Sequence, residues 1–140
     1  MTSLKLVIDT NVLISAALSA QGTPAKLLRW VLESHTLVFS QATFDELQSR
    51  IYRPKFDRYI TLEQRQRLLH DFNASAHWID LAPYPAYCRD PDDDKFIECA
   101  LYAQVPYVVS EDKHLLNLVQ YKQVRFLSAA EFLKAVDIKG

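Results

Sequence analysis

Short apolar runs alternate along this chain with segments of helical periodicity, and this alternation limits the folds that the chain can adopt. The apolar runs predict strands at residues 4–8, 36–39, 78–81, 107–110 and 124–127. Because helical segments lie between them, the connections are crossovers and the strands run mostly parallel. A parallel sheet is covered on both faces. We therefore predict an α/β fold, a three-layer α/β/α sandwich with a central, mostly parallel sheet of about five strands.

Capping residues mark where the helices begin. The capping positions are Thr23 before Pro24, Ser40, Thr61 with Gln64, Asp90 before Pro91, Asp112, and Ser128 with Glu131. Apolar residues follow these caps at helical spacing, as Phe44, Leu47 and Ile51 do after Ser40. The predicted helices therefore present an apolar face to the sheet.

Length and composition predict one globular domain. A chain of 140 residues buries roughly two thirds of its unfolded surface. Its 49% apolar and 24% charged residues are ordinary values. The formal net charge is −1, so contact with nucleic acid requires a local basic patch. The sequence has only two glycines, Gly22 and Gly140, which excludes phosphate-binding loops of the P-loop and Rossmann types.

The sequence shows no targeting or membrane-spanning pattern. Lys5 and Asp9 interrupt the N-terminal apolar run far below the length of a membrane span. Cys88 and Cys99 match no metal-binding spacing and no disulfide framework. We therefore expect a cytoplasmic protein.

Asp9 is the first candidate site residue, because it ends an apolar strand. A carboxylate is rarely buried unless something offsets its charge, and in open α/β sheets ligands bind at the carboxyl ends of the strands. Asp112 follows the fourth strand in the same way, so both carboxylates can reach one crevice. Taken alone, Asp112 is better explained as a helix cap.

The acidic run at residues 90–94 supplies a third candidate. Capping and the helix dipole account for two or three of these acids. They do not account for the phase of Asp93, which lies three and four residues before Phe96 and Ile97 and so falls on the apolar face. We expect Asp93 to point into the fold, with Asp94 as the next candidate.

Glu46, on the helix after the second strand, is the fourth candidate. Its simplest explanation is an ion pair with Arg50, four residues later. Four carboxylates drawn together would repel one another, and a divalent cation removes that repulsion. Carboxylate oxygens suit Mg²⁺ or Mn²⁺, which bind phosphate oxygens and activate water. The pattern indicates metal-dependent hydrolysis of a phosphate ester.

Other catalytic patterns are missing from the sequence. It contains no G-x-S-x-G nucleophile motif and no H-E-x-x-H pair. An aspartyl-phosphate phosphatase would carry a second acid two residues after Asp9, where Asn11 stands. Two alternatives stay open. One is a metal-dependent phosphatase, and the other is a non-catalytic RNA-binding or dimerisation module whose acids are helix caps.

Four motifs occur in order along the chain. They are Asp9-Thr10-Asn11, Asp45-Glu46-Leu47, Asp90-Pro91-Asp92-Asp93-Asp94-Lys95-Phe96 and Ser110-Glu111-Asp112. With them the chain resembles the PIN-domain ribonucleases over nearly its whole length. It is most similar to the branch that forms the toxin components of bacterial toxin–antitoxin systems.

The resemblance implies a single PIN-like nuclease domain over residues 1–140. It implies metal-binding and catalytic roles for four acids, namely Asp9, Glu46, Asp93 and Asp112, and site-ordering roles for Asn11 and Ser110. It also implies Mg²⁺- or Mn²⁺-dependent endonucleolytic cleavage of single-stranded RNA. A homodimer and a cognate antitoxin that blocks the site are the implied partners.

A basic segment at residues 50–67 is the candidate RNA contact. It carries Arg50, Arg53, Lys55, Arg58, Arg65 and Arg67 against Asp57 and Glu63, a local charge of +4, with Tyr52, Phe56 and Tyr59 interleaved. Phosphate contacts and stacking faces hold single strands in this way. A solvated helical hairpin with inward-packed aromatics explains the pattern equally well. The candidate RNA-binding residues are Arg50, Arg53, Lys55 and Arg58.

Overall fold

The computed structural model describes residues 3–80 and 91–136, with side chains in the second range from Asp94 onward. Within this part of the chain, six strands form one sheet in the order β3-β2-β1-β4-β6-β5. They are β1 (Lys5–Ile8), β2 (Thr36–Phe39), β3 (His77–Trp78), β4 (Tyr107–Val109), β5 (Gln120–Tyr121) and β6 (Val124–Leu127). All neighbours pair in parallel except β5 and β6. The predicted α/β fold is confirmed, with six strands in place of about five.

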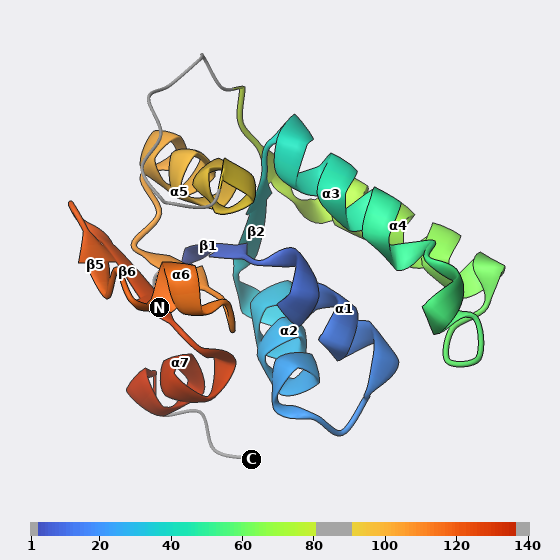
Figure 1. Ribbon diagram of the computed structural model, residues 1–140. Coiled ribbons are helices and arrows are strands. Elements are labelled where there is room, and N and C mark those ends of the chain that lie inside the picture. The colour runs from blue at the N-terminus through green and yellow to red at the C-terminus, as the bar shows by residue number, and fades with distance from the viewer. Residues whose placement is uncertain (1–2, 81–90, 137–140) are drawn as a thin grey trace.

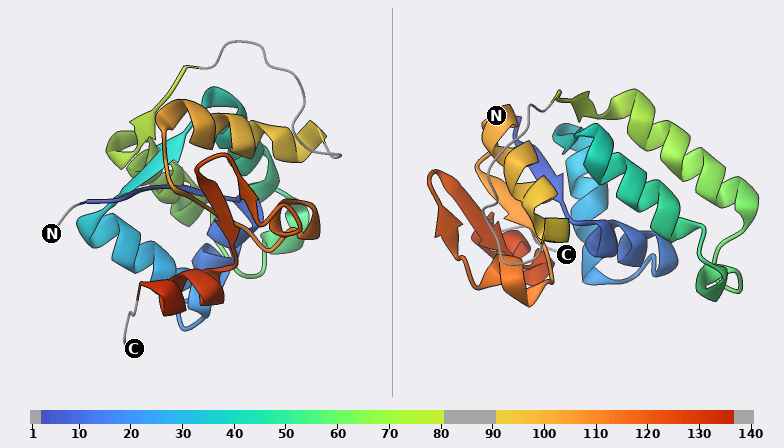
Figure 2. Two further views of the ribbon diagram at one scale, coloured as in Figure 1. Left: turned by 90° about the vertical axis from the view of Figure 1, so that its left-hand side faces the viewer. Right: turned by 45° about the horizontal axis from the view of Figure 1, so that its top comes forward.

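Helices surround this sheet (Figure 1). They are α1 (Thr10–Leu18), α2 (Thr23–Ser34), α3 (Gln41–Ile51), α4 (Leu62–Ser75), α5 (Pro91–Ala103), α6 (Lys113–Leu116) and α7 (Ala129–Ala135), with a 3₁₀ turn, η1, at Pro54–Phe56. In Figures 1 and 2, α3 and α4 lie side by side and extend away from the sheet. In the described ranges, no helix combines the length and the apolar character that crossing a membrane requires.

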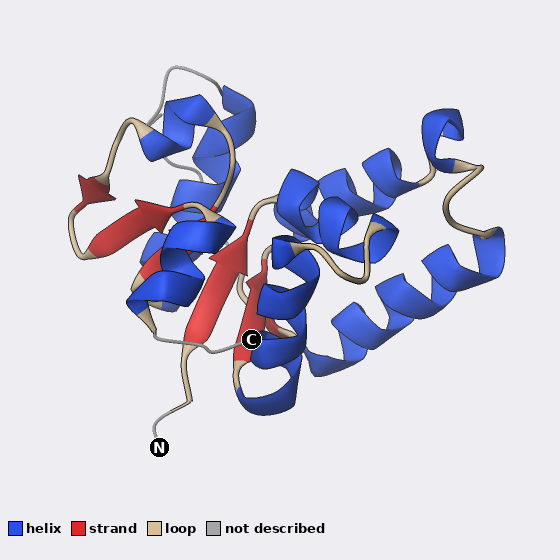
Figure 3. Cartoon of the chain, turned by 90° about the horizontal axis from the view of Figure 1, so that it is seen from below, coloured by secondary structure: helices blue, strands red, loops and turns tan. Residues whose placement is uncertain are grey.

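The alternation of side chains along the strands divides the core into two layers. Leu6 and Ile8 of β1 pack into one cluster with residues of α1, α2, α3, α4 and α7, whereas Val7 packs into a second cluster with α5. Figure 2 shows α5 on one side of the sheet and α2 and α7 on the other, and Figure 3 shows strands of the sheet side by side with helices around them. Full burial of one such side chain contributes about 1.5–3 kcal/mol. Side chains on both faces of β1 are therefore buried, and packing on both sides of the sheet stabilises this strand.

Capping boxes fix the starts of three helices. At α3, Ser40 Oγ accepts a hydrogen bond from the Thr43 amide at 3.2 Å, and Thr43 Oγ1 accepts one from the Ser40 amide at 3.0 Å. The predicted boxes at α4 and α7 are confirmed, with Thr61 and Gln64 in one and Ser128 and Glu131 in the other. Each such cap contributes about 1 kcal/mol. The cap of α3 fixes the residue at which that helix begins.

Three details differ from the sequence prediction. The helix α2 begins at Thr23 with Gly22 as its N-cap, so the predicted cap was wrong by one residue. The strand predicted at residues 78–81 is β3 at His77–Trp78 instead, where it pairs with Val38 and Phe39, the last two residues of β2. The hairpin strand β5 was not predicted; its turn places Lys122 at a φ of 53°. The predicted loop at 82–89 and the cap Asp90 lie outside the described residues.

Candidate active site

Asp9 lies where β1 meets α1, and it is almost fully buried. It is 4% exposed, and its amide donates to the Val109 carbonyl at 2.8 Å, which ties it to the end of β4. Ser110, the next residue after β4, is fully buried and donates from Oγ to Asp9 Oδ2 at 2.7 Å. Two adjacent parallel strands thus bring together residues far apart in the chain, as the sequence predicted.

Asp112 joins the same edge through Ser110. Its amide donates to Ser110 Oγ at 2.9 Å. Its carboxylate accepts a hydrogen bond from the His114 amide at 2.8 Å and so caps α6. The simple explanation of Asp112 as a cap is therefore confirmed. Its side chain is 31% exposed, and it lies at the rim of the site rather than in its floor.

Glu46 reaches the site from the middle of α3. Its carboxylate is 8% exposed and lies between Lys95, which contacts Oε2, and Arg50, whose Nη1 is 3.3 Å from Oε1. Oε1 is buried and makes no hydrogen bond within the described part of the chain. Arg50 also donates to Asn11 Oδ1 at 3.5 Å. The predicted Glu46–Arg50 pair is confirmed, and Asn11 orients Arg50.

Lys95 was not among the sequence candidates. It is the fifth residue of α5, and its side chain is 20% exposed. Lys95 directly follows the acidic run in the sequence. This position could have indicated a cation close to the acids of the site.

The pKa of Asp9 is raised above its ordinary value. Burial is the largest cause, and the negative charges of Glu46 and Asp112 add to it. Hydrogen bonds from the Ser110 hydroxyl and from the backbone N–H of Asn11 lower the pKa of Asp9. Because like charges raise the pKa of a carboxyl only at short range, the carboxylates of Asp9, Glu46 and Asp112 share one electrostatic environment.

The acidic run is described only in part. Asp94 is 6% exposed, and its charge, after burial, contributes to the raised pKa of Glu98. Phe96 and Ile97 form the buried face that the phase argument used. The side chain of Asp93 lies outside what the structure describes. The choice of Asp93 over Asp94 therefore stays a prediction.

The donors of this site suit a hard divalent cation. Asp9 and the unbonded Oε1 of Glu46 are buried carboxylate oxygens, the ligand type that Mg²⁺ and Mn²⁺ prefer. Among the described side chains, no three acids, histidines or cysteines stand close enough together to enclose an ion as they lie. The types of donor atom therefore fit a divalent metal ion. The Glu46 carboxylate, however, is paired with Arg50 and Lys95.

The basic segment divides into buried and exposed cations. Arg65 is 5% exposed, donates to Asp57 at 3.0 Å and lies 5.8 Å from the Tyr52 ring centroid. It holds the segment together, and it offers no contact to a ligand in solvent. Arg53, Lys55 and Arg58 are exposed. Of the three interleaved aromatics, Tyr59 is 62% exposed, and the other two are half-buried against the core.

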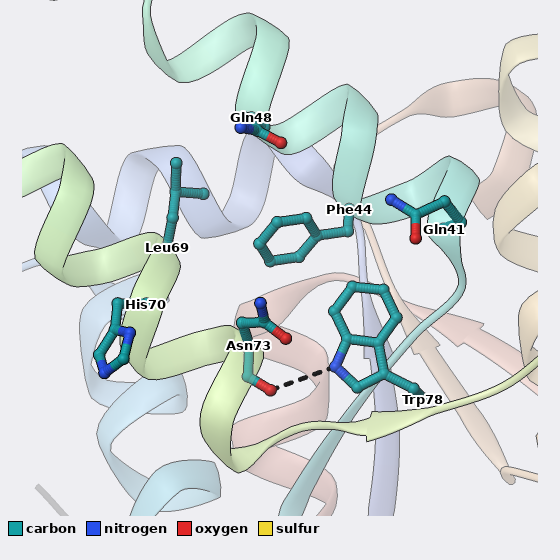
Figure 4. A pocket seen from close by; sticks show the side chains of 7 residues that line it. All are labelled: Gln41, Phe44, Gln48, Leu69, His70, Asn73 and Trp78. Carbon is teal, nitrogen blue, oxygen red and sulfur yellow. Dashed lines mark hydrogen bonds between the residues drawn. The ribbon is translucent and has the colours of Figure 1, made fainter.

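A separate hollow of about 470 Å³ lies between α3 and α4 (Figure 4). Its lining residues are Gln41, Phe44, Gln48, Leu69, His70, Asn73 and Trp78. Trp78 Nε1 donates to the Asn73 carbonyl at 3.2 Å, which fixes the indole ring. By helical phase, Phe44 and Gln48 lie on the opposite side of α3 from Glu46. The hollow is therefore not part of the acidic site.

Comparison with known sequences places the chain in a family. Residues 5–114 match the PIN domain family. The uncharacterized protein MJ1680 of Methanocaldococcus jannaschii is 33% identical over 117 residues, which cover 82% of this chain and 75% of that protein.

Solved structures share the fold at low sequence identity. PAE2754 from Pyrobaculum aerophilum superposes with a TM-score of 0.60 at 14% identity, covering 97% of this chain and 91% of that one. VapBC2 from Rickettsia felis, solved with a DNA fragment from its promoter, gives 0.57 at 13% identity, covering 88% and 98%. The family match spans well over half of the chain, and the chain belongs to the PIN-domain family of nucleases.

Proposed function

We propose that this protein is a metal-dependent endoribonuclease that cleaves single-stranded RNA. One observation carries the proposal: the buried carboxyl of Asp9 has a raised pKa, and the charges of Glu46 and Asp112 contribute to it. A fold that only needed helix caps would not gather two further acids around a buried carboxylate. Membership of a nuclease family supports the same reaction.

PIN-domain nucleases generally use divalent metal ions, and Mg²⁺ or Mn²⁺ is the proposed cofactor here. When bound, such an ion lowers the pKa of water and stabilises charge on phosphate oxygens. Asp9, Glu46 and Asp112 would hold it, with Asp93 as the fourth proposed ligand. Ser110 fixes the Asp9 carboxylate through its hydroxyl, and Asn11 fixes Arg50.

Single-stranded RNA is the proposed substrate because exposed cations lie on the segment that follows α3. Arg53, Lys55 and Arg58 can contact phosphates, and the exposed Tyr59 ring can stack on a base. Arg50 is closer to the acids and is engaged with Glu46. Arg50 would therefore contact RNA beside the acids, whereas Arg53, Lys55 and Arg58 would contact it along the exposed segment.

We also propose that the protein acts as the toxin of a toxin–antitoxin pair, as a homodimer blocked by a cognate antitoxin. The four motifs that resemble the toxin branch support this. The shared fold with VapBC2, a protein solved on its promoter DNA, is consistent with it. Co-purification of the chain with the product of an adjacent small gene, and loss of RNA cleavage in that complex, would test the pairing.

A non-catalytic RNA-binding module is the second candidate. It is favoured by two observations: Asp112 caps α6, and Glu46 is already neutralised by two cations. In that case the protein would bind RNA without cutting it, with or without metal.

RNA binding and cleavage measured on one sample separate the two candidates. We expect the wild-type protein to cleave a fluorescent single-stranded RNA in Mg²⁺ or Mn²⁺ and not in EDTA. Asp9→Asn should lose at least about 100-fold in rate while keeping its circular dichroism spectrum. Asp71→Asn, on the exposed surface of α4, is the matched control. A fully active Asp9→Asn protein would reject the proposed function.

A further inference from the structure

Two cations occupy the carboxylate of Glu46, and they come from different elements. Arg50 is on the same helix, four residues later, and is also held by Asn11. Lys95 comes from α5 and crosses to α3 to reach Oε2. The two side chains are 25% and 20% exposed, so both border solvent.

Glu46 is at the same time part of the acidic site, since its charge raises the pKa of Asp9. The Lys95 ammonium therefore already neutralises, through Oε2, the carboxylate that a metal ion would approach at Oε1. A divalent cation on one oxygen of a carboxylate and an ammonium group on the other repel each other, so binding of the cation weakens the hold on the ammonium group.

The two cations differ in how freely they can leave. Arg50 is fixed by its helix and by Asn11. A lysine ammonium is a compact charge on a flexible stem of four methylene groups, and it can rotate away without disturbing the helix. On release, it stays at the rim of a site whose substrate is an anion.

We propose that Lys95 is an exchangeable counterion that neutralises Glu46 in the metal-free protein, is released when a divalent cation binds, and then contacts an RNA phosphate. The inference rests on the proposed nuclease function. It predicts opposite effects of removing the charge: metal binds more tightly and RNA binds more weakly. A purely structural ion pair would predict neither effect.

The test uses Lys95→Met, which keeps the length of the side chain, with Lys95→Arg as the conservative variant. Lys26→Met on the exposed surface of α2 is the control. Calorimetric Mn²⁺ titration should give Lys95→Met a dissociation constant at least about fivefold lower than wild type. In Ca²⁺, its affinity for single-stranded RNA should fall about fivefold, and the slope of log K against log salt should lose about 0.7. Lys95→Arg should keep most RNA affinity.

Unchanged Mn²⁺ affinity in Lys95→Met, or RNA binding as tight as wild type, would overturn the inference. If the variant does not fold, the wild-type protein labelled with ¹⁵N-lysine provides the measurement. The ammonium signal that Lys95→Arg removes should shift on addition of Mg²⁺, and a signal that stays in place would overturn the inference. Absence of RNA cleavage by wild type would reject the proposed function instead, while the Mn²⁺ titration would still report on the exchange.

Discussion

The Ser110 hydroxyl donates to Asp9 Oδ2 at 2.7 Å, although 101 residues separate the two in the chain. The same hydroxyl accepts from the Asp112 amide at 2.9 Å. One buried oxygen thus joins the ends of β1 and β4 and lowers the pKa of Asp9 against the effect of burial.

Ser110→Ala should therefore raise the pKa of Asp9 further, because it removes a hydrogen bond to the charged form. We expect the acidic limb of the pH profile of kcat/KM to move to higher pH, and the free energy of unfolding to fall by about 1.5–3 kcal/mol. Ser128→Ala is the control: it removes a helix cap, costs about 1 kcal/mol and leaves the pH profile in place. Identical profiles for Ser110→Ala and wild type would contradict this role of the hydroxyl.

Asp9→Asn should stabilise the metal-free protein at neutral pH. The pKa of Asp9 is raised in the fold, so the folded protein keeps a proton that the unfolded chain releases. The contribution of Asp9 to stability therefore falls as pH rises from its ordinary value of 3.8 through the raised pKa. A gain of about 1 kcal/mol corresponds to roughly 4 °C in Tm.

Thermal unfolding of both proteins in EDTA, from pH 3.5 to pH 8, measures this effect. The difference in Tm should vanish near the acidic end and grow toward neutral pH. A difference that is independent of pH would mean that the ionised carboxyl of Asp9 carries no such cost.

Divalent cations should raise the Tm of the wild-type protein. A metal that binds only the folded state adds about 2.7 kcal/mol at a concentration 100 times its dissociation constant. We expect a shift with millimolar Mg²⁺ or Mn²⁺, referenced to EDTA-treated protein, and a much smaller one in Glu46→Gln. An equal shift in both proteins would place the metal elsewhere on the surface.

The exposed cations after α3 should contribute to RNA affinity without contributing to stability. Replacing Arg53, Lys55 and Arg58 together by alanine should lower the slope of log K against log salt by about 2, at roughly 0.7 for each phosphate contact. Tm should stay unchanged, because these side chains are exposed. Filter binding in Ca²⁺ at several salt concentrations measures the slope, and an unchanged slope would exclude this segment as the RNA contact.

Arg65 provides the contrast within the same segment. Arg65→Met removes the hydrogen bond to Asp57 and the guanidinium group beside the Tyr52 ring. It should cost about 0.5–1.5 kcal/mol of stability, the net worth of one hydrogen bond, because the exposed Asp57 carboxylate is rehydrated. RNA binding by the folded variant should stay at the wild-type level. If Arg65→Met were as stable as wild type and bound RNA weakly, Arg65 would be an RNA contact rather than a structural residue.

Much of the fold was predictable because local signals agreed with one another. The strand at Thr36–Phe39 and the capping boxes of α4 and α7 were predicted correctly from patterns within a few residues. The strand β5 was not, because two residues give too short a pattern and the hairpin depends on the backbone at Lys122. Its formation is decided by pairing with β6, which is a tertiary interaction.

The site was predictable in part for a similar reason. The proximity of Asp9 and Asp112 was predictable because parallel strands end at one edge of a sheet. The pairing of Lys95 with Glu46 was not, because it depends on how α5 packs against α3, across 49 residues of sequence. In the basic segment, the sequence could not distinguish buried Arg65 from its exposed neighbours, since that choice depends on the Asp57 and Tyr52 contacts.

The anomalous diffraction of Mn²⁺ in crystals of the wild-type protein tests the central claim most directly. The account predicts a peak bonded to the Asp9 carboxylate, with an oxygen of Glu46 among its neighbours and Lys95 turned away. The same map would distinguish Asp93 from Asp94 as a further ligand. Crystals soaked in Mn²⁺ that show no peak at Asp9, with Glu46 still paired to Lys95, would contradict the account.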